Sequence, residues 1–297
     1  MKFSEIIGNA EEKEYLAKSV KDNSFSQSYL FVGTEGIGKL LIAKEFAKKI
    51  LCLENGEDNC LCKSCKCFDG DNHTDYKLIN EQGETIKIEQ IRELTNHVIE
   101  RPIISERKVY IINDSDKMTK EAQNCLLKTL EEPPEFVVII LITANENAIL
   151  NTIHSRCMTV KFKNIANSDL QKYAMQTLGY EKITENLLNS FGGSIGKATM
   201  QLENQELFMQ VENWMNHLDN CDQIDALNEA KKICDKENMD KILEYMMICM
   251  YAKRSENPRY INCIEIIEEC FGRLKRNCNF DMSIDKMVWE IWECLHR

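Results

Sequence analysis

A glycine-rich stretch near the start of the chain has the composition of a phosphate-binding loop. It reads GTEGIGKL, and its characteristic residues are Gly33, Gly36, Gly38 and Lys39. Glycines let backbone N–H groups turn inward around phosphates, and the lysine reaches the outer phosphates of a nucleotide. Leu40 breaks the pattern, because Mg²⁺ needs an oxygen ligand where this chain has an aliphatic side chain. The alternative is a glycine-rich turn that binds no ligand.

The second half of an ATP site is also altered. ATPases end a later strand with an Asp that supports Mg²⁺ and, in many of them, a Glu that positions water. Here the apolar run KVYII is followed by Asn113 and Asp114, so in register Asn113 replaces the Asp and Asp114 the Glu. An amide is a poorer partner for Mg²⁺ than a carboxylate. Because Leu40 and Asn113 depart together, we expect no productive binding of ATP and Mg²⁺ and no hydrolysis.

Five cysteines lie close together some twenty residues after the loop. Within CLENGEDNCLCKSCKC they are Cys52, Cys60, Cys62, Cys65 and Cys67. The spacing of Cys62 and Cys65 is the C-x2-C knuckle that tetrahedral zinc sites use. The chain has 14 cysteines in all, and we expect reduced thiols or metal ligands rather than disulfides. A reduced loop without metal is the alternative, and His73 is expected at the surface or as a cap rather than as a ligand.

Five short apolar runs alternate with segments of helical pattern in the first half of the chain. The runs are SYLFV, DYKLI, KVYII, FVVIILIT and CMTVKF, at 28–32, 75–79, 108–112, 136–143 and 157–162. They show little polar alternation, which is typical of parallel strands covered on both faces. The helical patterns fall at about 38–51, 87–100 and 119–131. This order predicts a doubly wound α/β fold with a parallel sheet.

The second half of the chain shows only helical periodicity. In INCIEIIEECFGRL, for example, Ile264 and Ile267 fall on one face and Glu265 on another. A weak break near 208–220 divides this half into a small three-helix module and a larger terminal bundle. We therefore expect three domains: an α/β domain over 1–163 with the cysteine-rich insertion at 52–67, a small helical domain over 164–208, and a larger helical domain over 209–297.

Composition argues against several classes of protein. With 4 prolines and 12 glycines among 297 residues, a Gly/Pro-rich all-β protein is not expected. The net charge of −11 argues against a chain that binds nucleic acid alone through a broad basic surface. No apolar segment near Met1 reads as a signal peptide, and the apolar run Phe136–Ala144 is too short to span a bilayer. We expect a soluble, cytoplasmic protein without a membrane partner.

Several segments resemble the bacterial clamp-loader family of AAA+ proteins. They are FSEIIGNAE, QSYLFVG (27–33), IKIEQIREL (86–94), NCLLKTLEEPP (124–134), TAN (143–145), SRC (155–157) and GGSIGKA (192–198). The resemblance covers about residues 3–200, and beyond them only helical character agrees. It implies a P-loop AAA+ domain with a zinc-binding insertion, followed by an all-α lid and an all-α collar that associates into a ring.

Within that family, the resemblance implies a non-hydrolysing subunit of the delta-prime type. The ATP-hydrolysing members keep an intact loop and acid pair, so Leu40 and Asn113 point away from them. Arg156 of the SRC motif is then an arginine finger in trans, which stabilises charge on the phosphoryl group at a neighbour's ATP site. An ordinary salt bridge is the alternative for Arg156. Thr143 and Lys197 occupy the two sensor positions. The second hypothesis is a gamma/tau-like ATPase that binds or hydrolyses ATP with an atypical loop.

The resemblance also implies a metal-ligand set and partners. The family's zinc module has one cysteine at a helix end and three more at tight spacing, which corresponds to Cys52, Cys60, Cys62 and Cys65, with Cys67 as the alternative to Cys60. Four thiolates close a tetrahedral zinc site, so the metal would be structural. The implied partners are the gamma/tau motor subunits and the delta subunit in a hetero-pentamer, and through it the sliding clamp and primed DNA. By association, the chain belongs to the DNA polymerase III holoenzyme without being an enzyme by itself.

Overall fold

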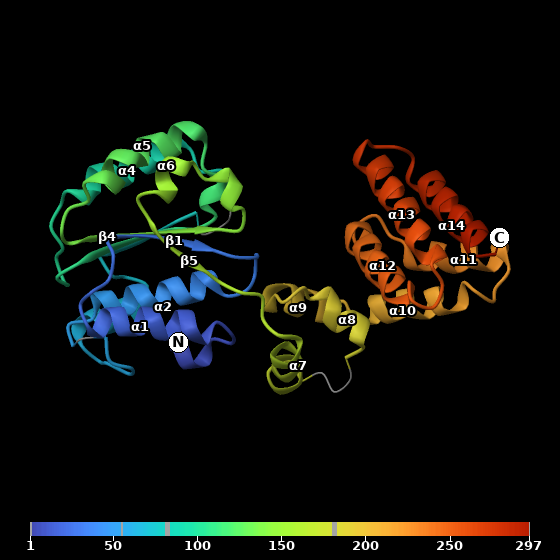
Figure 1. Cartoon of the computed structure of the whole chain (residues 1–297), viewed down its shortest axis with the longest axis horizontal. Helices are drawn as coiled ribbons and strands as arrows, with labels where there is room; N and C mark the ends of the chain where they lie inside the picture. Colours follow the sequence, from blue (N-terminus) through green and yellow to red (C-terminus); the bar gives the residue numbers. More distant parts are fainter. Residues whose placement is uncertain (1, 55, 81–83, 180–182, 297) are drawn as a thin grey trace. The chain divides into compact units, whose positions relative to one another are not determined.

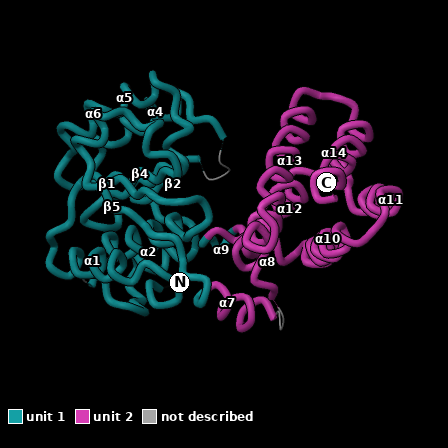
Figure 2. The backbone as a smooth tube through the Cα atoms, turned by 45° about the vertical axis from the view of Figure 1, so that its right-hand side comes forward, with its two compact units in different colours: residues 1–169, 193–196 teal, residues 170–192, 197–297 magenta. Residues whose placement is uncertain are grey.

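The chain forms two compact units in a computed structural model that describes residues 2–54, 56–80, 84–179 and 183–296. The first unit comprises residues 1–169 and 193–196, and the second comprises 170–192 and 197–297 (Figure 2). A short segment from the second half of the sequence therefore packs with the first unit.

A five-stranded parallel sheet forms the middle layer of the first unit. Its strands are β1 (Ser28–Val32), β2 (Tyr76–Ile79), β3 (Lys108–Ile112), β4 (Val137–Thr143) and β5 (Met158–Lys161), in the order β2-β3-β4-β1-β5. Every residue of β1, β3 and β4 is buried. The absence of polar alternation in these runs follows from that burial, since helices cover both faces of the sheet.

Helices lie on both faces of this sheet (Figure 1). One face is covered by α1 (Ala10–Lys21) and α2 (Lys39–Leu51), and the other by α4 (Ile88–Val98), α5 (Lys120–Glu131) and α6 (Asn151–His154). Alternate residues of β1 enter the two cores, with Tyr29 and Phe31 on the α1–α2 side and Leu30 and Val32 on the α4–α5 side. The predicted doubly wound α/β fold is confirmed, with strand and helix ends within two residues of those expected.

Short elements complete the first unit. They are the 3-10 helices η1 (Phe3–Glu5), η2 (Ser115–Lys117) and η3 (Glu146–Ala148), and α3 (Lys63–Asp69), which packs on α2 inside the cysteine-rich insertion. The loop after β1, the residues after β3 and Thr143 of β4 all lie at the carboxyl end of the sheet, because the strands are parallel. Ligand sites of doubly wound folds lie at this edge.

The second unit is helical throughout the residues that the structure describes. Its helices are α7 (Asn167–Gln176) and α9 (Ile195–Leu202), which each begin with residues of the first unit, and α8 (Glu185–Ser190), α10 (Gln205–His217), α11 (Gln223–Ile233), α12 (Met239–Lys253), α13 (Arg259–Lys275) and α14 (Phe280–His296). Helices α13 and α14 pack on each other and bury Cys263, Ile267 and Ile291. The expected boundary near residue 208 lies inside α10, a 13-residue helix.

Candidate functional site

The glycine-rich loop joins β1 to α2, as a phosphate-binding loop does. Gly36 and Gly38 have positive φ angles of 75° and 93°, a backbone conformation that favours glycine. Lys39 is the first residue of α2 and is only 6% exposed. Its ammonium group donates to the carbonyl oxygens of Gly33 and Thr34, at 2.5 and 2.7 Å. In this structure the loop therefore provides acceptors for its own lysine.

The charge of Lys39 is set by two opposing effects. Burial lowers the pKa of the Lys39 ammonium, whereas the carboxylates of Asp114, Glu35 and Asp116 raise it, and the effect of burial is the larger. The two aspartates after β3 thus lie close enough to act on the lysine of the loop. This arrangement brings the glycine-rich loop and the residues after β3 together at one end of the sheet.

A segment distant in sequence lies against the loop. The N–H group of Gly196 donates to the carbonyl oxygen of Gly36 at 3.0 Å. A Cβ atom added at Gly36 would lie 2.3 Å from Ser194 Oγ, so only glycine fits at this contact. The loop is therefore covered at Gly36 by residues 193–196, which belong to the same compact unit.

The two departures from an ATPase pattern have clear structural positions. Leu40 packs against the hydrophobic core between the sheet and the α1–α2 face. The side-chain amide of Asn113 lies 3.5 Å from the carbonyl oxygen of Asn80, whose own amide donates back to the Asn113 carbonyl at 3.2 Å. Asp114 has a left-handed backbone, with φ 46°, and forms an ion pair with Lys117 at 3.1 Å. Leu40 itself offers no oxygen ligand for Mg²⁺, and none of the contacts described for Asn113 and Asp114 supplies one in its place.

The two expected sensor residues differ in their surroundings. Thr143 is fully buried at the end of β4, and its hydroxyl donates to Asp116 at 2.7 Å. Lys197 instead forms an ion pair with Glu244 of α12, at 3.1 Å, with both side chains about half exposed. Thr143 is thus joined to the aspartates after β3, and Lys197 to a carboxylate of the second unit.

Arg156 lies between α6 and β5 and is held by residues of the first unit. One guanidinium nitrogen donates to the Thr152 carbonyl at 2.7 Å and to Ser155 Oγ at 3.2 Å, and the other forms an ion pair with Glu131. The side chain of Arg156 is 30% exposed, so a partner can still reach it. Burial raises the pKa of the neighbouring Cys157 thiol to about 12, so this cysteine is poorly suited to act as a nucleophile.

Four cysteines of the insertion converge. The sulfur atoms of Cys52, Cys60, Cys62 and Cys65 all lie within 4.8 Å of one another. Backbone N–H groups donate to three of these sulfurs, from Glu54 to Cys52, from Cys62 to Cys60 and from Cys65 to Cys62. Among the described residues, Cys67 does not belong to this group. These four cysteine sulfurs are soft ligands, and they lie close enough together to share one metal ion. Their number and type fit a structural zinc site.

The acid–base properties of the cluster favour a thiolate at Cys62. Burial acts to raise the pKa of this thiol, but hydrogen bonds from the N–H groups of Cys65 and Leu53 outweigh it and bring the pKa to about 7. Thiolate, rather than thiol, is the form that binds metal.

The expectation that His73 lies at the surface is wrong, although its imidazole does accept from a nearby backbone N–H group, as a capping side chain does. The imidazole is 5% exposed and lies 2.8 Å from Ser64 Oγ and 3.3 Å from Ser105 Oγ, while Nδ1 accepts from the Asp75 N–H group at 3.1 Å. Both serine hydroxyls also donate to the Leu51 carbonyl. This buried network joins the insertion to the end of α2 and to the sheet. No local pattern around His73 indicates it, because the two serines come from segments near residues 64 and 105.

Comparisons with known proteins place these features in a family. The family model described as DNA polymerase III, delta subunit, matches residues 8–166. The DNA polymerase III subunit delta' of Bacillus subtilis is 40% identical over 149 residues, which are 50% of this chain and 45% of that protein. The DNA polymerase III subunit tau/gamma of Haemophilus influenzae is 34% identical over 187 residues, which are 61% of this chain and 26% of that protein. The match thus spans less than half the length of either relative.

A solved structure agrees at the level of the fold. The crystal structure of a DNA polymerase III gamma subunit-related protein from Thermotoga maritima matches with a TM-score of 0.51 and 19% identity, over 96% of this chain and 99% of that one. Among the helices that the structure describes, none is long and apolar enough to cross a membrane.

Proposed function

Because this chain belongs to the DNA polymerase III delta subunit family, a clamp-loader family of AAA+ proteins, we propose that it is the delta-prime-type subunit of a clamp loader. In this role it hydrolyses no ATP itself. It provides Arg156 to the ATP site of a neighbouring motor subunit, so that the assembly can load a sliding clamp on primed DNA.

One observation carries the first part of this proposal. The amino group of Lys39 is bound to the carbonyl oxygens of its own loop, and the next residue, Leu40, has an aliphatic side chain that packs against the core. A working site needs this lysine on the outer phosphates and an oxygen at residue 40 for Mg²⁺. The amide of Asn113 adds a second weak metal position.

The position of Arg156 supports the second part. Its guanidinium is partly exposed and its orientation is fixed by acceptors from α5 and α6. A guanidinium is permanently charged and presents planar donors, which suit the oxygens of a phosphoryl group in transfer. An arginine supplied in trans in this way raises the rate at the receiving site by about 10³- to 10⁵-fold.

The four converging cysteines complete the proposal with a structural metal. Zinc would be held by Cys52, Cys60, Cys62 and Cys65, and it would supply fold stability rather than chemistry, because four protein ligands leave no open position. The cytoplasmic partners would be gamma/tau motor subunits and delta in a hetero-pentamer. Residues 164–208 would form the lid and 209–297 the collar, with α10 crossing the boundary between them.

Reconstitution with the motor and delta subunits, the clamp and primed DNA tests this function. We expect the isolated chain to show no ATPase activity. In the complex, Arg156→Ala should remove the part of the DNA-stimulated ATPase activity that comes from the one motor-subunit site to which Arg156 contributes. Circular dichroism of the variant should match the wild type. Unchanged turnover in complexes that contain Arg156→Ala would refute the finger role.

A second candidate is a gamma/tau-like ATPase. The observation in its favour is that the match to the Haemophilus influenzae tau/gamma subunit covers more of this chain than the match to the Bacillus subtilis delta' subunit, at 61% against 50%. The retained Lys39 is compatible with it. Robust Mg²⁺-dependent hydrolysis by the isolated chain would establish this candidate instead.

A further inference from the structure

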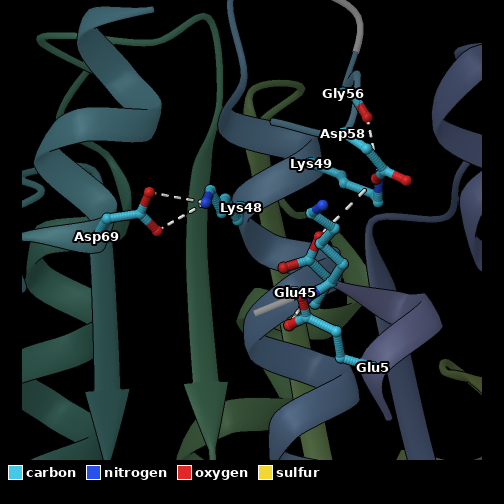
Figure 3. A network of polar contacts seen from close by, with 8 residues as sticks. Glu5, Glu45, Lys48, Lys49, Gly56, Asp58 and Asp69 are labelled. Carbon is cyan, nitrogen blue, oxygen red and sulfur yellow. Dashed lines mark hydrogen bonds and ion pairs between the residues drawn. The ribbon is translucent and has the colours of Figure 1, made fainter. Parts of the chain in front are cut away.

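Two adjacent lysines near the end of α2 hold the two sides of the cysteine-rich insertion (Figure 3). The ammonium group of Lys48 contacts both carboxylate oxygens of Asp69, at 2.6 and 2.8 Å. That of Lys49 donates to the carbonyl oxygen of Gly56 at 2.9 Å and to Asp58 Oδ1 at 2.5 Å. We call Lys48 and Lys49 the lysine pair.

The partners of the lysine pair flank the cysteines on either side. Asp69 is the last residue of α3, which contains Cys65 and begins directly after Cys62. Asp58 lies two residues before Cys60. Lys48 therefore fixes the segment that carries the C-x2-C knuckle, and Lys49 fixes the segment that leads to Cys60. Cys52, the remaining cysteine of the cluster, directly follows α2 itself.

The contact of Lys49 with Gly56 is buried, and both lysine side chains are mostly removed from solvent. The side chain of Lys49 is 10% exposed, and that of Lys48 is 18% exposed. Gly56 packs tightly against α1 and α2, since a Cβ atom there would lie 3.0 Å from Val20 of α1 and 3.2 Å from the side chain of Lys49 of α2. An exposed ion pair contributes little because water and salt screen it, but a buried ammonium group that loses its acceptors is strongly unfavourable. The buried Lys49–Gly56 contact therefore fixes the 56–58 segment more firmly than a surface ion pair does, whereas the two ion pairs reach aspartates that are 55% exposed.

The lysine pair and three of the cysteines line one cavity, together with the carboxylates of Asp58 and Asp69 that pair with the lysines. Lys48 and Lys49 line a cavity of about 230 Å³ together with Cys52, Cys60 and Cys65. Converging thiolates repel one another until a cation neutralises them, and nearby positive charge reduces that repulsion. Groups outside the ligand set that orient and support metal ligands typically change metal affinity by about 10- to 100-fold.

We propose that Lys48 and Lys49 are positioning residues of the four-cysteine site: they hold its two segments against α2 so that the thiolates converge before the metal binds. This inference rests on the proposed zinc site. By this inference, α2, the helix after the glycine-rich loop, helps to build the four-cysteine site. The spacing of the cysteines alone does not indicate this role of α2.

The test measures zinc affinity of the purified full chain by competition with a chromophoric chelator. We expect Lys48→Met with Lys49→Met to bind Zn²⁺ about 10- to 100-fold more weakly than the wild type. Asp58→Asn with Asp69→Asn should also weaken binding, by a smaller factor, because it removes both ion pairs but keeps both positive charges and the Lys49–Gly56 contact. Lys66→Met, at an exposed lysine of α3, removes the same charge near the cysteines and should leave affinity unchanged.

Cobalt absorption and circular dichroism separate the outcomes. Weaker binding with an unchanged cobalt–thiolate spectrum and unchanged helix content supports positioning. Wild-type affinity in both the lysine and the aspartate double variants would overturn the inference and leave the zinc site standing. A wild-type chain that binds neither metal would overturn the zinc site and the inference with it. If the lysine double variant does not fold, the aspartate double variant decides the question.

Discussion

Arg156 forms an ion pair with Glu131, the last residue of α5, so the arginine of the SRC motif is joined to the end of the helix that leads into the LEEPP segment. The two side chains are 30% and 49% exposed. The second guanidinium nitrogen remains bound to Thr152 and Ser155 of its own segment. To reach a phosphoryl group, the arginine must exchange Glu131 for phosphate oxygens while its other contacts hold its direction.

This exchange predicts the effect of Glu131→Gln. Removing the carboxylate charge makes the exchange easier, so we expect the DNA-stimulated ATPase of the reconstituted complex to rise by up to about fivefold. A partly exposed pair contributes at most about 1 kcal/mol, and about 1.4 kcal/mol corresponds to tenfold. Glu132→Gln, at the adjacent exposed carboxylate, is the matched control and should have no effect. A fall to the level of Arg156→Ala would mean that Glu131 is needed to orient the arginine.

The phosphate-binding loop leads to a second prediction. We expect Leu40→Thr with Asn113→Asp to remain without Mg²⁺-dependent hydrolysis in the isolated chain, because Lys39 stays bound to Gly33 and Thr34, and residues 193–196 still cover Gly36. The variant should also lose about 2 kcal/mol of stability, since Leu40 packs against the core. An ATPase assay and a urea melt measure the two effects. Turnover in the double variant alone would show that the missing metal ligands were the sole defect.

The cysteines provide a third prediction, with a matched pair of variants. Zinc analysis of purified protein should give one Zn²⁺ per chain for the wild type and for Cys67→Ser, and none for Cys65→Ser or Cys60→Ser. The reason is that Cys60 and Cys65 belong to the cluster of converging sulfurs, whereas Cys67 on the same short helix does not. Cys65→Ser should also lower the melting temperature, because a structural metal contributes directly to folding. Loss of zinc in Cys67→Ser with retention in Cys60→Ser would reverse the ligand assignment.

Much of the first unit could be predicted from the sequence because its strands are buried on both faces. A strand such as Val137–Thr143, with every residue buried, must be apolar throughout, and that pattern is visible without knowledge of the neighbours. The order of strands and helices then leaves few topologies open. The glycine loop and the cysteine knuckle are local motifs, and the structure places each next to its expected element.

The contacts that could not be predicted are those made between distant segments. His73 is buried because Ser64, Ser105 and Asp75 surround it, and none of these residues marks the histidine in the sequence. Gly36 meets Ser194 across more than 150 positions. Lys48 and Lys49 read as ordinary solvent-facing lysines of an amphipathic helix until α3 and the 56–58 segment fold against them. The sequence carries no periodic signal for such pairings.

A buried carboxyl group beside the lysine pair gives a prediction for pH. Burial raises the pKa of Glu45 to about 7, although Lys49 and Lys48 act to lower it, and the side chain is 7% exposed. The unfolded-state pKa is lower, near the ordinary value of 4.5. Between these two pH values the folded chain keeps a proton that the unfolded chain has released, so stability falls as pH rises through the window.

We therefore expect Glu45→Gln to remove this part of the pH dependence. The free energy of unfolding of the variant, relative to the wild type, should increase by about 3 kcal/mol in total from pH 4.5 to pH 7, at about 1.4 kcal/mol per unit, and stay constant above pH 7. Urea melts of both proteins at several pH values measure this difference, in which the contribution of the cysteines cancels because both chains carry them. Glu14→Gln, at an exposed position of α1, controls for the substitution itself. A flat difference between the Glu45→Gln variant and the wild type would mean that Glu45 is ionised in the folded chain throughout this range, with Lys49 compensating fully for its burial.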